Sequence, residues 1–96
     1  MKVTAWKNGT YGIRVGKKNA HKFFKKEWEN IKVEIDGVFH TFKLASTFWA
    51  TCPEFRGKTI KAWLLSRKLI PWPKGKPPML ELIPLGENRF RLARGQ

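Results

Sequence analysis

The chain has 96 residues, of which 20 are lysine or arginine and seven are aspartate or glutamate, giving a net charge of +13. A chain of this length forms a single domain, residues 1–96, and 42% apolar and 14% aromatic residues exclude a disordered basic tail. One cysteine excludes an internal disulfide and no apolar run could span a membrane, so we expect a cytoplasmic protein without a membrane partner.

The positive charge falls in two blocks. Residues 1–26 contain eight basic and no acidic residues, residues 27–54 contain two basic and five acidic residues, and residues 55–80 contain seven basic and no acidic residues. This asymmetry favours a polyanionic partner, which gains affinity through electrostatic steering and counterion release. The alternative is a lysine-coated surface without a partner, although such surfaces usually carry matching glutamates.

The first predicted element is a hairpin with Asn8-Gly9 at its turn, because this dipeptide is typical of tight hairpins. A two-residue turn pairs Trp6 with Tyr11 and fixes which side chains face inward. Gly12 indicates a bulge or a close approach of two backbones, as does Gly16. The side chains expected inside the protein are Trp6, Tyr11, Ile13 and Val15.

Residues 16–26 form the densest basic segment, and a short helix is expected from about Asn19, an acceptable N-cap. The functional interpretation is a basic arm that lies on phosphates. The structural interpretation is a solvated helix whose Phe23 and Phe24 close one end of a barrel. The two interpretations are compatible.

The central hairpin, Ile31–Leu44, has the strongest turn signal in the chain, Asp36-Gly37 between two β-rich runs. A type I′ turn places Ile35 opposite Val38 and Ile31 opposite Phe42. One face of the hairpin is then apolar and is expected to face the core, and it consists of Ile31, Val33, Ile35, Val38, His40 and Phe42.

Residues 51–54 match a capping box that would begin a helix, preceded by Phe48 and Trp49 as a core plug. Thr59–Lys68 is the best helix candidate, because Ile60, Trp63 and Leu64 share one stripe. The four prolines of Ile70–Pro78 predict a stiff basic loop carrying Trp72, which either stacks on a base or, as we favour, covers the core. A last hairpin joins Met79–Ile83 to Arg89–Leu92 around a loop at 84–88, with inward side chains Leu80, Leu82, Phe90 and Leu92.

These elements predict an α+β, β-rich fold: a small open barrel or pseudo-barrel of antiparallel hairpins with one or two short capping helices.

No catalytic, metal or cofactor site is predicted. His21 and His40 lack a cysteine or acidic partner at ligand spacing, and one cysteine cannot build a zinc ribbon. Gly57-Lys58-Thr59 resembles the end of a phosphate-binding loop, but Cys52 stands where that loop needs glycine. The seven acidic residues provide no obvious carboxylate pair, so a nucleic-acid hydrolase is the least favoured interpretation and we expect no enzyme.

Nucleic-acid binding fits this composition better. The 14 lysines suit phosphate contacts, whereas base recognition more often uses arginine, of which there are six. We predict binding of double-stranded DNA, in preference to RNA, without catalysis. The predicted contact residues are Arg14, Lys17, Lys18, Asn19, Lys22, Arg56, Lys58, Lys61, Trp72, Lys74 and Lys76.

Two alternatives stay open at the level of the sequence. One is a protein-interaction or accessory subunit that docks on an acidic protein, and the other is a barrel that binds RNA or single strands by stacking. The sequence does not specify the oligomeric state.

The order of these features resembles the B3-type DNA-binding pseudobarrel of plant transcription factors and of the recognition domains of some restriction enzymes. The resemblance covers roughly residues 13–92. It rests on Ile13-Arg-Val-Gly-Lys-Lys before Phe23-Phe24, on the central hairpin, and on Ile60–Leu69 followed by Lys74-Gly75 and Leu80–Ile83.

This resemblance implies a barrel, closed by helices, that grips the major groove of DNA with two arms. By position, the first arm would comprise Arg14, Lys17, Lys18, Asn19 and Lys22. The second arm would comprise residues around Thr47, Trp49, Arg56 and Lys58.

Overall fold

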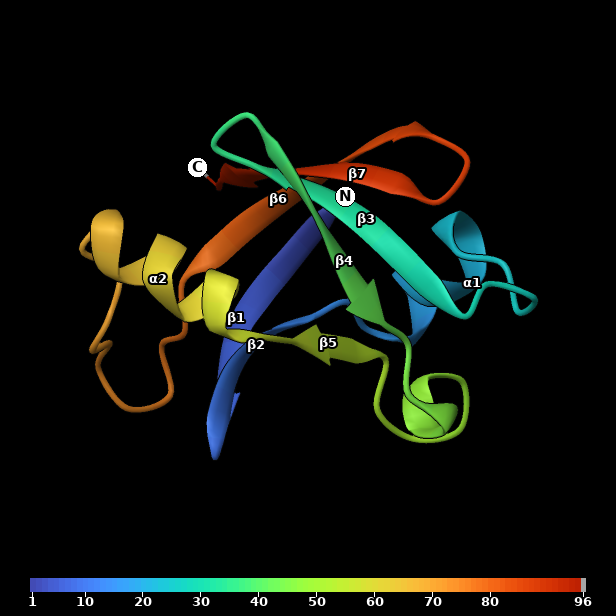
Figure 1. The fold of residues 1–96 in the computed structure, drawn as a ribbon. Coiled ribbons are helices and arrows are strands. Elements are labelled where there is room, and N and C mark those ends of the chain that lie inside the picture. The colour runs from blue at the N-terminus through green and yellow to red at the C-terminus, as the bar shows by residue number, and fades with distance from the viewer. Residues whose placement is uncertain (96) are drawn as a thin grey trace.

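A computed structural model of the chain describes residues 1–95, and its strands form one seven-stranded sheet that curls into a nearly closed barrel (Figure 1). The strands lie in the order β4-β3-β7-β6-β1-β2-β5. The predicted fold class, a β-rich α+β barrel with two short helices, is confirmed. The elements are β1 (Lys2–Asn8), β2 (Thr10–Arg14), α1 (Lys17–Phe23), β3 (Asn30–Ile35), β4 (Val38–Lys43), the 3₁₀ turn η1 (Ser46–Phe48), β5 (Glu54–Arg56), α2 (Lys58–Ser66), β6 (Met79–Gly86) and β7 (Arg89–Arg94).

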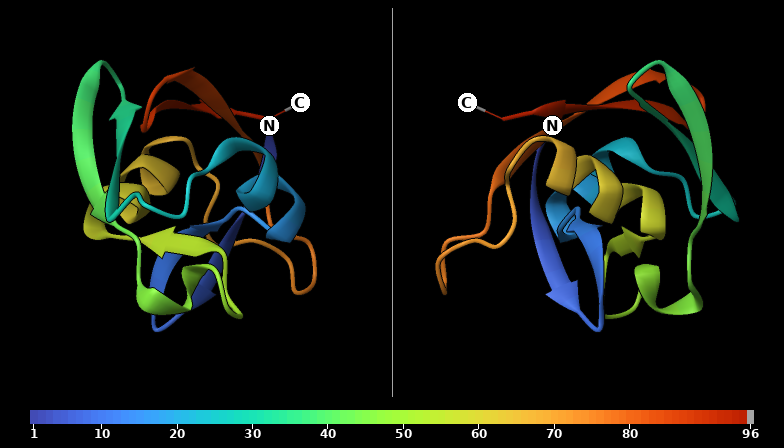
Figure 2. Two further views of the ribbon diagram at one scale, coloured as in Figure 1. Left: turned by 90° about the vertical axis from the view of Figure 1, so that its right-hand side faces the viewer. Right: turned by 60° about the vertical axis from the view of Figure 1, so that its left-hand side comes forward.

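The barrel nearly closes where its two edge strands approach each other. Phe42 on β4 packs against Phe55 on β5 with their ring centroids 5.1 Å apart. Both rings are buried in a continuous apolar core that every strand and both helices supply. The two helices lie toward opposite sides of the barrel, as Figures 1 and 2 show.

The central hairpin has the predicted register, with Ile35 opposite Val38 and Ile31 opposite Phe42. Asp36 and Gly37 both adopt positive φ, 51° and 84°, as a type I′ turn requires. Val38 differs from the prediction, because it is exposed at the hairpin tip. The inward face of β3 is therefore fully buried, whereas that of β4 becomes buried only toward Phe42.

The register of the first hairpin differs from the prediction by one residue. Asn8 pairs with Thr10, which leaves Gly9 alone at the tip, and Trp6 pairs with Gly12 rather than with Tyr11. The residues of β1 that enter the core are Val3 and Ala5, whereas the predicted Trp6 and Tyr11 are only half-buried. The predicted burial of Ile13 and Val15 is confirmed.

Two predicted helix starts are wrong, in each case because tertiary contacts dominate over the local signal. Helix α1 begins at Lys17, and the Asn19 side chain instead donates hydrogen bonds to the carbonyl oxygens of Lys2 and Val15. Residues 51–53 do not cap a helix, because the Pro53 carbonyl oxygen accepts a 2.8 Å hydrogen bond from the amide of Val15. Glu54 then begins strand β5.

The predicted stripe of α2 is confirmed, with Ile60, Trp63 and Leu64 buried. The helix ends two residues earlier than expected, because Lys68 adopts a positive φ of 56°. Phe48 and Phe24 are buried as expected for core plugs, and Phe24 stacks on Phe90 at 4.9 Å.

The last hairpin buries the four predicted side chains, but β6 continues to Gly86 instead of ending at Ile83. Pro84 is tolerated inside the strand because β1 pairs with β6 only along Met79–Glu81, so no neighbouring strand on that side needs the missing amide. In contrast to the hairpins, β7 joins β3 in parallel. Among the described residues, no helix is long and apolar enough to cross a membrane.

Candidate nucleic-acid interface

The most distinctive surface feature is an indole ring flanked by two guanidinium groups, which we call the Trp6 cluster (Trp6, Arg14 and Arg56). The Cζ atoms of Arg14 and Arg56 lie 5.1 and 5.5 Å from the centroid of the Trp6 ring, within cation–π distance. The three residues come from the adjacent strands β1, β2 and β5. Both arginines are exposed, so their charges face solvent from a fixed aromatic base.

Gly12 explains why the edge of the Trp6 ring can approach β2 so closely. A Cβ atom at this position would lie 2.8 Å from Trp6 Nε1 and 2.6 Å from the carbonyl oxygen of Phe55. The predicted close approach at Gly12 is thus confirmed. The Trp6 Nε1–H is buried and has no acceptor among residues 1–95.

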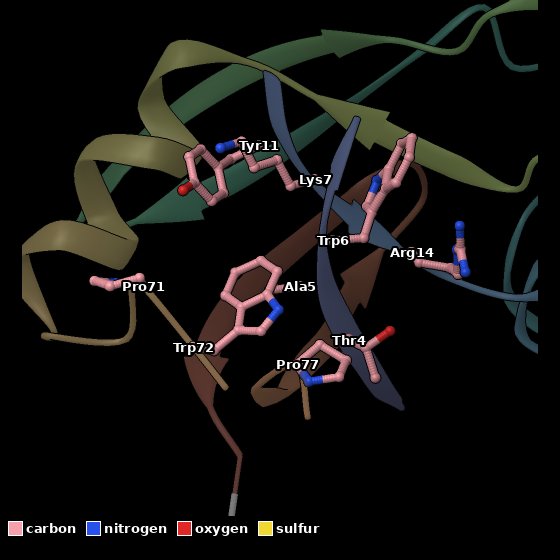
Figure 3. A pocket seen from close by; sticks show the side chains of 9 residues that line it. All are labelled: Thr4, Ala5, Trp6, Lys7, Tyr11, Arg14, Pro71, Trp72 and Pro77. Carbon is pink, nitrogen blue, oxygen red and sulfur yellow. The ribbon is translucent and has the colours of Figure 1, made fainter. Parts of the chain in front are cut away.

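A cleft of about 440 Å³ runs beside the Trp6 cluster, between the first hairpin and the proline-rich loop, and we call it the loop cleft. Its aromatic part is Tyr11, which meets the Trp72 ring edge-on at 5.7 Å and carries Lys7 Nζ 5.3 Å above its face. Figure 3 shows Tyr11 and Trp72 on one side of the hairpin, with Trp6 and Arg14 on the other. The complete lining is Thr4, Ala5, Trp6, Lys7, Tyr11, Arg14, Pro71, Trp72 and Pro77.

A second hollow, of about 340 Å³, continues this surface toward α2. It shares Lys7 and Tyr11 with the loop cleft and adds Lys58 and Lys61 from the first turns of the helix. Three ammonium groups therefore line one concavity, an arrangement that attracts anions.

Three of the seven acidic side chains form ion pairs away from this surface. Asp36 pairs with Arg67, Glu34 pairs with Arg91 at 2.6 Å, and Glu81 pairs with the N-terminal amine at 2.6 Å. Glu54 differs from these three, because its carboxylate lies 3.8 Å from the Arg56 guanidinium inside the basic region. The surface around β1, β2, β5 and the start of α2 is consequently rich in positive charge, with the Trp6 cluster and the lysine-lined hollow on opposite sides of the first hairpin.

The structure brings some of the predicted contact residues together and separates others. Arg14, Arg56, Lys58, Lys61 and Trp72 line or flank the two adjoining hollows. Lys74 and Lys76 are exposed on the loop that borders the loop cleft. Trp72 is half-buried and packs against the core, so the favoured covering role is partly fulfilled while the ring also faces the cleft.

The predicted residues on α1 form a separate group. The exposed lysine side chains of this helix are Lys17, Lys18 and Lys22. The His21 ring of the same helix packs against Trp49, so the helix lies beside Trp49 and not beside the Trp6 cluster. Asn19 anchors the helix to β1 and to the residue that follows β2, because its side-chain amide donates hydrogen bonds to the carbonyl oxygens of Lys2 and Val15.

Three residues of the surface were missed by the sequence prediction: Trp6, Lys7 and Tyr11. Trp6 and Tyr11 were assigned to the interior by a register one residue out, and no local signal distinguishes the two registers. Lys7 was overlooked although it lies in the acid-free first block. Comparison of the chain with protein-family models, curated proteins and solved structures finds no match.

Proposed function

We propose that the protein binds nucleic acid, with double-stranded DNA as the principal ligand, and that it does so without catalysis. The observation that carries the proposal is the Trp6 cluster beside a lysine-lined hollow. A guanidinium held at cation–π distance from an indole keeps N–H donors available for a phosphate oxygen, and Arg56 does so although its Nη1 also donates to the Asn8 carbonyl oxygen. Two such groups on one ring form a preorganised contact for a polyphosphate backbone.

The arrangement of the strands supports a duplex as the ligand. The tip of the β1–β2 hairpin and the segment around η1 both lie at the lower end of the molecule in Figures 1 and 2. Strands β2 and β5 join these two projections, and Arg14 and Arg56 lie on that connection. Of the two arms that the B3-type resemblance implies, the second, around Thr47, Trp49, Arg56 and Lys58, coincides with the projection at η1.

The charge distribution supports phosphate contacts as the main source of affinity. Lys58 and Lys61 in the second hollow and the exposed loop lysines 74 and 76 add positive charge around the first hairpin. Neutralising phosphates with such side chains releases counterions, so affinity should fall steeply as salt is raised. Base recognition would be a smaller contribution.

The test compares a double variant in the cluster with a matched double variant elsewhere. Arg14→Gln with Arg56→Gln removes two charges from the proposed interface, whereas Lys32→Gln with Arg89→Gln removes two charges from neighbouring exposed positions on β3 and β7. Binding of labelled duplex DNA, single-stranded DNA and duplex RNA is measured by fluorescence anisotropy across a salt series.

For duplex DNA, the cluster variant should bind at least tenfold more weakly, and its slope of log affinity against log salt should be shallower by about 2. The control variant should retain nearly the wild-type affinity and slope. Equal losses in both variants would show that the charge acts generically. Failure of the wild type to bind duplex DNA more tightly than a basic control protein of similar size would contradict the proposal, and saturable one-to-one binding to an acidic protein would then identify the alternative.

A further inference from the structure

A concavity larger than the loop cleft lies beside η1, and we call it the Trp49 cleft. It has a volume of about 720 Å³ and lies where β3 begins and β4 ends, beside η1. Two tryptophans, Trp28 and Trp49, contribute to its wall, and Lys26, Glu29 and Lys43 supply its charged groups. No part of the proposed duplex contact requires this combination of groups.

Both tryptophans are half-buried and held by phenylalanines of the core. The Trp28 ring meets Phe24 edge-on at 5.9 Å and Phe90 edge-on at 6.2 Å. The Trp49 ring meets Phe48 edge-on at 5.3 Å. Rings fixed on one side by the core present a rigid aromatic surface on the other, and such surfaces bind flat ligands at a low cost in conformational entropy.

The polar groups of the cleft suit a flat ligand that carries an anion. Lys26 Nζ lies 6.0 Å from the Trp49 ring, and Lys43 provides a second ammonium group on the opposite strand end. The Glu29 carboxylate can accept a hydrogen bond from an exocyclic amino group. The Trp49 Nε1–H is buried and has no acceptor among residues 1–95, so its hydrogen-bonding capacity is unused in the free protein.

The cleft is connected to the Trp6 cluster by a short stretch of chain. Trp49 and Arg56 are seven residues apart, so their Cα atoms are separated by at most about 25 Å. This distance corresponds to about seven base pairs along B-DNA. A nucleic acid of this length or longer is therefore long enough to span the Trp6 cluster and the cleft.

We infer that the Trp49 cleft receives an unpaired base of the bound nucleic acid. The base stacks on the exposed surfaces of Trp28 and Trp49, its neighbouring phosphate lies against Lys26 and Lys43, and Glu29 contacts its edge. The inference rests on the proposed function, because the Trp6 cluster supplies the contact to the adjoining duplex. It makes the protein selective for duplexes interrupted by a bulge, a mismatch or a single-stranded end.

The first experiment measures an affinity ratio. Wild-type protein is titrated with a fully paired duplex and with the same duplex carrying one bulged base. We expect the bulged duplex to bind about tenfold more tightly, since stacking of one base on an aromatic side chain has an effect of this size. In Trp49→Leu the ratio should fall to about one, whereas Phe39→Leu, which alters an exposed aromatic side chain of β4 that lines neither cleft, should retain the ratio.

The second experiment does not depend on the stability of a tryptophan variant. A 5-iodouracil at the bulged position is irradiated in complex with the wild-type protein, and the crosslinked peptide is identified by mass spectrometry. We expect crosslinks to Trp28 or Trp49. Lys26→Gln with Lys43→Gln, which alters only exposed side chains, should lower the affinity ratio and the crosslink yield together.

The outcomes separate the two proposals. If wild-type protein fails to bind the paired duplex, the proposed function itself is wrong. If it binds the paired duplex but shows no preference for the bulge, or if the crosslink maps to Trp6 or Trp72, the duplex contact stands and the base-binding cleft is overturned. Tighter binding of a free mononucleotide than of the bulged duplex would also overturn it, because the base would then not need a strand.

Discussion

At the scale of single residues, the proposed interface depends on a glycine as much as on its arginines. Gly12 lets Trp6 lie against the sheet, and Trp6 in turn supports Arg14 and Arg56 at cation–π distance. Each such contact contributes about 0.5–1 kcal/mol at an exposed site. Their main effect is therefore to orient two charges rather than to stabilise the fold.

Gly12→Ala tests this arrangement. The added Cβ would lie within 3 Å of three neighbouring atoms, one of them a backbone oxygen that cannot move freely. We expect the free energy of unfolding, measured by urea denaturation, to fall by about 1–3 kcal/mol, as in other overpacked sites. DNA affinity should fall as well, because Trp6 must shift away from the arginines.

Thr10→Ala is the control for this substitution, because Thr10 is exposed on the same strand. Its unfolding free energy should stay within about 0.5 kcal/mol of the wild type. A Gly12→Ala protein as stable as this control would show that Trp6 does not pack tightly against β2.

At the scale of elements, the residue types that the turn of the β3–β4 hairpin tolerates at position 37 are limited by backbone conformation, not by space. Gly37 has a φ of 84°, and nothing lies within 4 Å of a Cβ built there. Gly37→Ala should therefore lower the unfolding free energy by about 1–2 kcal/mol, the cost of a left-handed residue with a side chain. Gly37→Asn should lose less, because asparagine tolerates this conformation.

The two glycine positions thus respond differently to the same pair of substitutions. Asparagine is the milder change at Gly37 and should be the more harmful one at Gly12, where its larger side chain meets the Phe55 carbonyl group and the Trp6 ring. Thermal denaturation of the four variants checks the order. The reverse order at Gly37 would mean that contacts, not φ, govern the turn.

The hairpins also show how far local sequence signals determine an element. Asp36-Gly37 fixed the register of the central hairpin correctly, because both residues occupy the left-handed region of the turn. Asn8-Gly9 has the same chemistry, yet only Gly9 has positive φ and the register moves by one residue. In the observed register Val3 and Ala5 are buried and Trp6 is not. Core packing therefore selects between two registers that the Asn-Gly dipeptide alone would allow.

At the scale of the whole molecule, the barrel class was predictable and its interface only partly so. Alternating apolar strands and one amphipathic helix specify a small barrel. The Trp6 cluster needed the pairing of β2 with β5, and β5 lies in a segment that resembles a helix cap. A contact between residues 6 and 56 cannot be inferred from either local sequence.

Salt should affect the stability and the binding of this protein in opposite directions. At a net charge of +13, the folded state repels itself, and screening relieves that repulsion. Raising sodium chloride from about 50 to 500 mM, across which the Debye length falls below about 10 Å, should increase the melting temperature while weakening DNA affinity. The double variant Arg14→Gln with Arg56→Gln should gain less stability from the same salt than the wild type does. An equal gain would show that the charge repulsion relieved by salt does not involve these two arginines.

The strand that comes last in the chain lies near the middle of the sheet. Strand β7 joins β3 on one side and β6 on the other. During synthesis, segments emerge from the ribosome in sequence order, so β3 and β6 each carry a free edge until β7 is released. The nascent chain can thus form its early hairpins one at a time, but it assembles a barrel, and with it a rigid interface, only when translation has passed Arg94.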